Sequence, residues 1–412
     1  MRILRSTVIV IPAVLLAACS DRNQPSTVLT ETPEQVLAQL AKSGHAVNAM
    51  LGGGRVQYLG FEVLPERALP GDEVRLIHYW TARVPLDRPY RVFVHALIQG
   101  AAGWLPHGDH LPIPSPKHWP VGKVIRDEHP LVLPEILPAD EVELRVGLYL
   151  GNDRLTVDRA ETQDGQNRIL AGHFKVAGAP IPLPSYHAPR LTRPPSLDGK
   201  IDDREWGQAP WIDGFFASRG DRPSSLKTRV RIAWDAEHVY VAWDAEDPDL
   251  QATFTRRDDP VYREEAIEMF IDPARTRRDY VELETSPTGV IFDSRFTGGP
   301  RQNPDPSFNA GFTVKVVAEG TLNDSYDRDG GFRAEWQIDV ATLPEAKVPL
   351  TVDTCWLINL FRIAKDRVNG REAPDESAWS PPLMGDFHNL ERFGDLCFTD
   401  ETQGIHDQGA ER

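Results

Sequence analysis

The chain has 412 residues, carries a formal net charge of −16 at pH 7, and contains 41% hydrophobic and 26% charged residues. These values are ordinary for a folded protein and exclude both a largely disordered chain and a multi-pass membrane protein. The excess of negative charge repels phosphate backbones, so nucleic acid is not an expected partner. Proline (35 residues) and glycine (31 residues) are frequent, which indicates many turns between short strands and predicts an all-β fold.

Residues 1–18 are predicted to be a lipoprotein signal peptide. Two arginines, Arg2 and Arg5, precede an apolar run over residues 7–18 that is too short to span a bilayer. The sequence LAAC that ends at Cys19 resembles the bacterial lipobox, whose cysteine is acylated. Cys19 is therefore the expected lipidation site, and the resemblance implies that Ser20 after it favours the outer membrane. We expect a protein that is lipid-anchored in the bacterial cell envelope; an ordinary secretory signal is the alternative.

Residues 19–55 are expected to be a tether that contains a short helix. Hydrophobic residues such as Val36 and Leu40 recur at near-helical spacing, and Pro33 suits a first helical turn. A helix is predicted over residues 32–51, and the three glycines at 52–54 would end it.

From Val56 onward the hydrophobic period changes to two, which is typical of strands. Short apolar-alternating segments separated by proline and glycine turns predict a β-sandwich over residues 56–178. Its predicted strands cover residues 56–64, 73–80, 91–98, 142–150 and 168–176.

Residues 179–195 contain six prolines and are predicted to be a semi-rigid linker between two domains. Residues 196–400 again alternate with a period of two and predict a second β-sandwich, and residues 401–412 form a polar tail. The strands predicted in the second sandwich cover residues 227–235, 238–246, 264–272, 278–285, 289–295, 311–318, 331–339, 354–363 and 394–399.

Cys355 and Cys397 remain once Cys19 is set aside for lipidation. Disulfides persist in the cell envelope, but both residues lie in strand-like segments where buried free thiols are also common. A disulfide between them and two free thiols are both left open.

The second sandwich carries motifs in a recognisable order. SLDGKIDDREW (196–206), DDPVYREEAIEMFIDP (258–273), DYVELETSPTGVIFD (279–293) and FHNLERFGDLCF (387–398) resemble the family 9 carbohydrate-binding modules and their relatives. The resemblance covers about 193–400 and implies a β-sandwich fold with a carbohydrate as the expected partner.

Alternation along residues 264–272 supports this expectation independently. It sends Ile267, Met269 and Ile271 to one face of the strand, and Glu268 and Phe270 to the other. Carboxylates can hydrogen-bond vicinal hydroxyls, and an aromatic ring can pack on the apolar face of a sugar. The second face therefore has the chemistry that a sugar requires.

The resemblance implies specific roles for three residues. Tyr262 and Phe387 match the two aromatic positions that sandwich a terminal sugar, although both are tryptophan in strong sugar binders. Glu268 matches a carboxylate that accepts hydrogen bonds from sugar hydroxyls, and Glu284 stands near a position where such binders can present an arginine. Trp379 lies in a predicted loop and is the tryptophan that we expect to be exposed for ligand contact.

Calcium is considered as a cofactor because relatives of this family bind it structurally and because oxygen-rich loops suit it. The preferred candidate is an acidic cluster that follows a predicted strand. Its members are Asp244, Glu246, Asp247 and Asp249.

The first sandwich shows a weaker resemblance over 56–178. PGDEVRLIHYW (70–80), YRVFVHAL (90–97) and LRVGLYLGNDRL (144–155) resemble a small β-sandwich domain found beside polysaccharide-related glycosyltransferases. This resemblance assigns no site residue.

The leading hypothesis is a membrane-anchored lipoprotein that binds carbohydrate through its second sandwich and is not an enzyme. The main alternative is a structural lipoprotein that binds another envelope protein and does not bind sugar. A glycoside hydrolase accessory is a further alternative, since family 9 modules accompany such enzymes. Haem binding is another, since related sandwiches carry haem on methionine and histidine or lysine, and Met269, Met384 and His388 are the candidate ligands.

Overall fold

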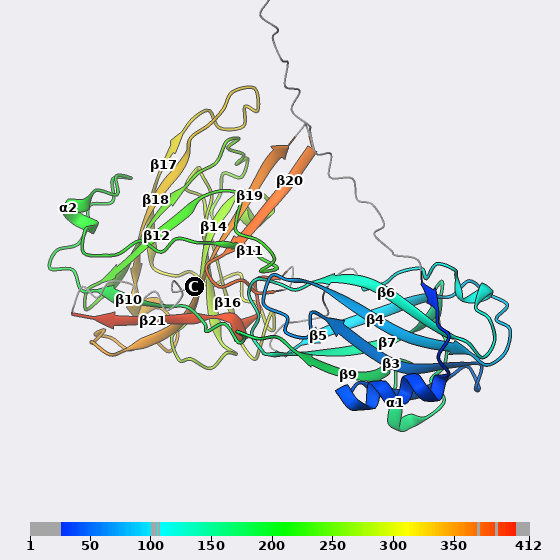
Figure 1. Ribbon diagram of the computed structural model, residues 1–412. Coiled ribbons are helices and arrows are strands. Elements are labelled where there is room, and N and C mark those ends of the chain that lie inside the picture. Colours follow the sequence, from blue (N-terminus) through cyan, green and yellow to red (C-terminus); the bar gives the residue numbers. More distant parts are fainter. Residues whose placement is uncertain (1–25, 100–104, 106–107, 369–370, 384–385, 401–412) are drawn as a thin grey trace, which may run out of the picture.

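The structure is a computed structural model that describes residues 26–99, 105, 108–368, 371–383 and 386–400. The predicted signal peptide with Cys19 and the polar tail at 401–412 lie outside the described residues. The described chain forms two domains, each built from two β-sheets (Figure 1), which confirms the predicted all-β fold. Within these ranges, no helix combines the length and the apolar character needed to cross a membrane.

The first domain packs two sheets around one hydrophobic core. The first sheet has the order β1–β6–β4–β3–β2 and consists of β1 (Thr27–Val28), β6 (Val124–Val132), β4 (Glu73–Ala82), β3 (Val56–Leu64) and β2 (Ala46–Leu51). The second sheet centres on β7 (Glu141–Leu150), which pairs with β5 (Arg91–Ile98), β8 (Asp153–Arg154) and β9 (Ile169–Lys175). Two short 3-10 helices, η1 (Pro116–His118) and η2 (Ala160–Thr162), lie in its connections.

The helix near the start of this domain is shorter than predicted. Helix α1 (Pro33–Ser43) begins with a capping box, in which Thr32 Oγ1 accepts from the backbone N–H of Gln35 and the Gln35 side chain accepts from the N–H of Thr32. It ends at Gly44, which takes a left-handed conformation with φ of 79°. The prediction of a helix as far as Leu51 was therefore wrong. Residues 27–51 contribute strands to the first sandwich and are not a tether.

The second domain is the larger sandwich. Its main sheet has the order β10–β21–β19–β14–β15–β16, with β10 (Ser185–Pro189), β21 (Gly394–Thr399), β19 (Cys355–Val368), β14 (Ala266–Asp272), β15 (Tyr280–Thr285) and β16 (Ile291–Phe296). β20 (Arg371–Ala378) pairs with β19 and with β11 (Phe216–Ala217). The second sheet contains β12 (Thr228–Trp234), β13 (His238–Ala245), β18 (Gly331–Asp339) and β17 (Phe312–Glu319). Short helices α2 (Asp203–Trp206), η3 (Val261–Arg263), η4 (Val340–Thr342) and η5 (Leu390–Arg392) lie between strands.

The alternation predicted for β14 is confirmed. Ile267, Met269 and Ile271 are fully buried in the core between the two sheets. Phe270 belongs to a separate cluster on the opposite face. The main sheet therefore presents an acidic and aromatic face away from the sandwich core.

The predicted linker at 179–195 contains a strand of the second domain. β10 runs parallel to β21 at the edge of the main sheet, and Tyr186 from β10 is buried in the core of the second sandwich. An edge position tolerates proline because one side of the strand needs no ladder hydrogen bonds. The second domain thus begins near Ser185, earlier than predicted.

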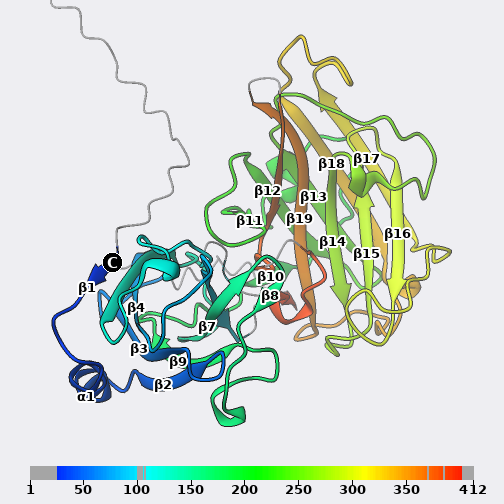
Figure 2. The same ribbon diagram turned by 90° about the vertical axis from the view of Figure 1, so that its right-hand side faces the viewer.

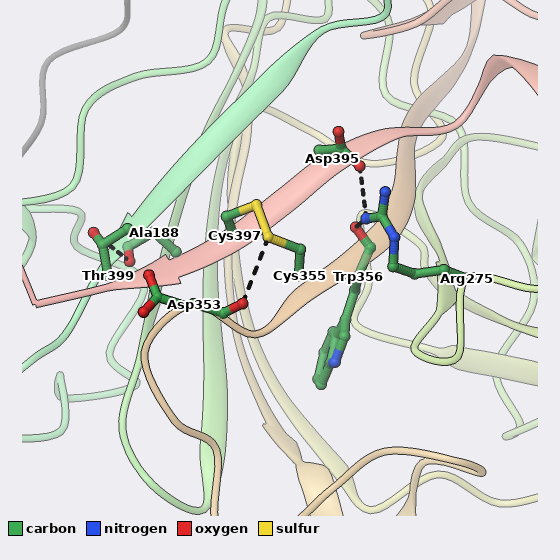
Figure 3. The surroundings of a disulfide bond; sticks show 8 residues. All are labelled: Ala188, Arg275, Asp353, Cys355, Trp356, Asp395, Cys397 and Thr399. Atoms are coloured by element: carbon green, nitrogen blue, oxygen red, sulfur yellow. Dashed lines mark hydrogen bonds and ion pairs between the residues drawn. A yellow bond between two sulfur atoms is a disulfide. The ribbon is translucent and has the colours of Figure 1, made fainter.

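Cys355 and Cys397 form a disulfide bond (Figure 3). They occupy directly paired positions on the antiparallel strands β19 and β21. The bond fastens these two strands beside β10, where the chain enters the second domain.

The two domains also meet through backbone hydrogen bonds. The N–H groups of Glu135 and Ile136 in the first domain both donate to the carbonyl of Gly220 in the second, at 3.1 and 3.3 Å. Figure 1 shows the two domains side by side.

Candidate functional site

A cavity of about 630 Å³ lies on the acidic and aromatic face of the main sheet. This volume is within the usual range for small-molecule sites. Figure 2 shows strands β14, β15 and β16 side by side, and all three contribute to the lining. Three residues singled out from the sequence, Tyr262, Glu268 and Phe387, line this one cavity.

The two aromatic residues reach the cavity from different segments. Tyr262 comes from η3, is 41% exposed, and contacts the ring of Phe292 edge-on at 5.3 Å between centroids. Phe387 comes from the segment before η5 and stacks on Phe361 of β19. Because Phe361 covers one face of Phe387, only the other face and the ring edge can meet a ligand.

Three glutamates from adjacent strands meet at the base of the cavity. Glu268 on β14 is directly paired with Glu284 on β15, and Glu282 lies two residues earlier on the same face. Each offers a carboxylate oxygen within 4.8 Å of the oxygens of the other two. Glu268 and Glu282 line the cavity, while Glu284 is fully buried.

Burial and mutual repulsion change the acidity of these groups. Burial, with the charges of Glu282 and Glu376, raises the pKa of Glu268 well above its ordinary value. Burial raises the pKa of Glu282 to about 7. The pKa of Glu284 is also raised, by burial and then by Glu268 and Glu282. The three carboxylates are therefore not stable together in the ionised state unless a positive charge compensates them.

Arg301, Asp386 and His388 also line the cavity and add polar side chains to it. Arg301 forms an ion pair with Asp386, with 2.9 Å between Nε and Oδ2. The Tyr280 hydroxyl and Nδ1 of His388 are hydrogen-bonded to each other, and burial lowers the pKa of His388 to about 4. The cavity thus combines apolar rings, charged donors and carboxyl groups.

The structure does not bring Trp379 into this cavity. Ala378 packs with the aromatic cluster on the cavity face, and alternation sends the next side chain to the other face. Trp379 is half-buried there and packs against the core of the second sandwich. Its expected exposure for ligand contact is corrected accordingly.

The four carboxylates proposed for calcium do not converge. Asp244 pairs across β12 and β18 with Arg229 and Arg333, which flank it in the strand register. Asp247 is buried in an ion pair with Arg362. Asp249 accepts a hydrogen bond from Gln251, and Glu246 is exposed. Among the described residues, the carboxylates that do come within ligand distance of one another are those of Glu268, Glu282 and Glu284.

The haem ligands considered from the sequence are also separated. Met269 points into the sandwich core, whereas His388 lines the cavity on the other face of the sheet. They cannot approach one iron together. Met384 lies outside the described residues.

Several cavity residues were not predicted. Glu282 could have been found, because the alternation that places Glu268 on this face also places Glu282 there once β14 and β15 are paired. Arg301 and Asp386 come from separate connections, and no local periodicity brings them together. Phe292 required the register of β15 with β16.

A cavity of this size, with aromatic walls and carboxyl groups at its base, has the chemistry to hold a small polar ligand with apolar faces. Residues 197–401 match the family described as carbohydrate family 9 binding domain-like. The second domain belongs to this family, as its motifs suggested.

Curated relatives include two large enzymes. The chain is 23% identical over 264 residues to endo-1,4-beta-xylanase A of Thermotoga maritima, which covers 62% of this chain and 22% of that enzyme. It is 26% identical over 149 residues to endo-1,4-beta-xylanase A of Thermotoga neapolitana, covering 34% of this chain and 13% of that enzyme. The chain therefore spans less than a quarter of the length of either relative.

Among solved structures, a family 9 carbohydrate-binding module from Caldicellulosiruptor kristjanssonii in complex with glucose is similar, with a TM-score of 0.38 and 17% identity. The match covers 54% of this chain and 99% of that chain.

Proposed function

We propose that this protein is a non-catalytic lipoprotein that binds carbohydrate in the cavity on the main sheet of its second domain. The observation that carries the proposal is the convergence of Tyr262, Glu268 and Phe387 on one cavity, although Phe387 lies far from the other two in the sequence. The rings supply apolar packing for the carbon–hydrogen faces of a sugar, and the carboxyl groups supply partners for its hydroxyls.

Binding can be tested with both domains together, as residues 20–412. Isothermal titration uses glucose, cello-oligosaccharides and xylo-oligosaccharides, because similar modules are described in complex with glucose and cellotriose and the matched enzymes are xylanases. We expect Tyr262→Ala to weaken binding at least tenfold, which corresponds to about 1.4 kcal/mol. The matched control is Tyr326→Ala, because Tyr326 is fully exposed and does not line the cavity.

The proposal fails if no glycan in a broad array is retained by the wild-type protein. It also fails if the Tyr262→Ala and Tyr326→Ala variants bind with equal affinity. Release of reducing sugar from xylan by the wild-type protein would replace the binding proposal with a hydrolase.

We infer from the LAAC sequence that acylation of Cys19 anchors the protein to the cell envelope, with the outer membrane as the expected location. Two or three acyl chains bind a soluble body firmly to a bilayer without a spanning helix. Labelling of growing cells with a fatty-acid probe should mark the wild-type chain and not Cys19→Ser. Equal labelling of both would contradict the assignment.

A further inference from the structure

The base of the cavity holds three carboxyl groups, none of which forms an ion pair with a neighbouring basic side chain that the structure describes. None of the ion pairs within the described ranges includes Glu268, Glu282 or Glu284. Arg301 lines the same cavity but is paired with Asp386. Arg362 lies on the neighbouring strand and is paired with Asp247 on the core side of the sheet.

The second observation concerns hydrogen bonds. Among the residues that the structure describes, no donor lies in hydrogen-bonding geometry to either carboxylate oxygen of Glu284, although the Glu282 carboxyl and the backbone N–H of Tyr262 act on it electrostatically, and Oε1 of Glu268 has no partner. Glu284 is 0% exposed and Glu268 is 1% exposed. Buried polar groups are normally satisfied, and a buried carboxylate without a partner is strongly disfavoured. The unpartnered oxygens of Glu284 point to a positively charged ligand that binds at this place.

The donor set and its spacing select the kind of cation. All three donors are carboxylate oxygens, which hard cations prefer. Calcium binds oxygen at about 2.3–2.6 Å, so two oxygens on opposite sides of one ion are about 5 Å apart. One carboxylate oxygen from each glutamate lies within 4.8 Å of those of the other two, which is no wider than this span. Magnesium needs a tighter shell with bond lengths of about 2.1 Å.

We propose that Glu268, Glu282 and Glu284 bind a calcium ion at the base of the cavity. Calcium takes six to eight oxygen ligands, and three carboxylates can supply at most six. Because Glu268 and Glu282 line the cavity, the remaining coordination positions face the space where a ligand enters. Vicinal hydroxyls of a sugar can occupy them, and this second step rests on the proposed function.

The metal site is tested without sugar. Residues 20–412 are stripped with EDTA, dialysed, and titrated with calcium chloride by calorimetry. We expect one calcium ion per chain, binding at least tenfold more weakly in Glu284→Gln, and weaker binding of magnesium to the wild-type protein. Glu246→Gln is the matched control, because Glu246 is an exposed acid outside the cavity and its removal should leave the affinity unchanged.

Glu284 is fully buried, so its replacement can impair folding. Glu282→Gln is the second variant, because Glu282 lies at the cavity wall and should weaken calcium binding without disturbing the core. Circular dichroism confirms that each variant is folded. Absence of calcium binding at millimolar concentration overturns the proposal, as does equal affinity in the wild type, Glu282→Gln and Glu284→Gln.

A sugar titration with calcium or with EDTA separates the two proposals. Calcium binding without any sugar binding supports the metal site and removes the proposed function. Sugar binding that is equal in calcium and in EDTA supports the proposed function and removes calcium from the ligand contact. Binding of an amino sugar in EDTA, with no calcium binding, assigns the three glutamates to an ammonium group and overturns the metal site.

Discussion

Phe387 lies face to face on Phe361, with 4.3 Å between ring centroids and 7° between ring planes. It is only 9% exposed, whereas Tyr262 on the same cavity is 41% exposed. The two aromatic residues therefore differ in how far they contribute to the packing of the domain. Phe387 is part of the packing of the domain as well as of the cavity wall, and Tyr262 serves the cavity alone.

Phe387→Ala is expected to lower the free energy of unfolding by about 3 kcal/mol, because it removes a stacked and nearly buried ring. Tyr262→Ala is expected to lower it by less than about 1 kcal/mol, since the ring is largely exposed. Urea denaturation followed by tryptophan fluorescence measures both. Similar losses in the two variants would contradict the distinction.

The buried ion pair between Arg362 and Asp247 should be important for stability. Both side chains are 0% exposed, so replacing Arg362 with leucine leaves an isolated charge in the interior. We expect a loss of about 3–5 kcal/mol in the free energy of unfolding. Lys200→Ala is the control, because the pair of Lys200 with Asp198 is largely exposed and should contribute little to stability.

Two of the buried histidines in the first domain, His78 and His129, predict acid sensitivity. Burial lowers the pKa of His78 to about 3, and burial followed by the charges of His110 and His78 lowers the pKa of His129. Burial would also lower the pKa of His110, but its hydrogen bond to Asp127, the charge of that carboxylate and smaller contributions from Gly108 and Asp109 together outweigh burial and raise the pKa.

His78 and His129 are neutral in the folded protein but bind protons in the unfolded chain below a pKa of about 6.5. Between about pH 6.5 and pH 3 the unfolded state therefore binds more protons than the folded state. The free energy of unfolding decreases as the pH falls through this range. Each histidine contributes a slope of up to about 1.4 kcal/mol per pH unit. His110 has the opposite sign, because its raised pKa makes the folded state bind its proton first, so it adds stability as the pH falls toward about 6.5 and no slope well below that pH.

The measurement is scanning calorimetry of the wild type and His129→Phe between pH 7 and pH 4. His129 has no hydrogen-bond partner on either ring nitrogen among the described residues, so phenylalanine is a close replacement. The melting temperature should fall less steeply with acid in the variant. Parallel curves would show that His129 is not the group responsible.

The disulfide should contribute substantially to the second domain. Cys355 and Cys397 are 42 residues apart, and closing a loop of that length stabilises a protein by about 4 kcal/mol in the chain-entropy description. Urea denaturation with and without dithiothreitol should show this loss in the wild type. The double variant Cys355→Ala, Cys397→Ala should be insensitive to the reductant, and an unchanged wild-type midpoint would contradict the expectation.

Sequence periodicity located strands well where hydrophobic and polar residues alternate. The strand predicted at 264–272 corresponds to β14 (Ala266–Asp272), and its two faces are as predicted. β6 (Val124–Val132) was missed, because it carries Asp127, Glu128 and His129 and looks like an exposed polar segment. These residues are buried, and Asp127 is paired with His110 from a distant loop.

The candidate site was also predicted only in part from the sequence. Motif resemblance identified Tyr262, Glu268 and Phe387, which line one cavity. It did not identify the triplet of glutamates, because the register of β14 with β15 creates that juxtaposition. Contacts that join connections far apart in the chain, such as Arg301 with Asp386, are properties of the tertiary fold.

The parallel pairing of β10 with β21 has a mechanical consequence. His187 on β10 lies opposite Cys397, and the disulfide fastens that position to β19, the neighbour of β14. A force applied to the chain before Ser185 and directed along β10 acts on all the hydrogen bonds between β10 and β21 together. It does not break them one after another. Load from the first domain can therefore reach the sheet beneath the ligand cavity without peeling the second domain open.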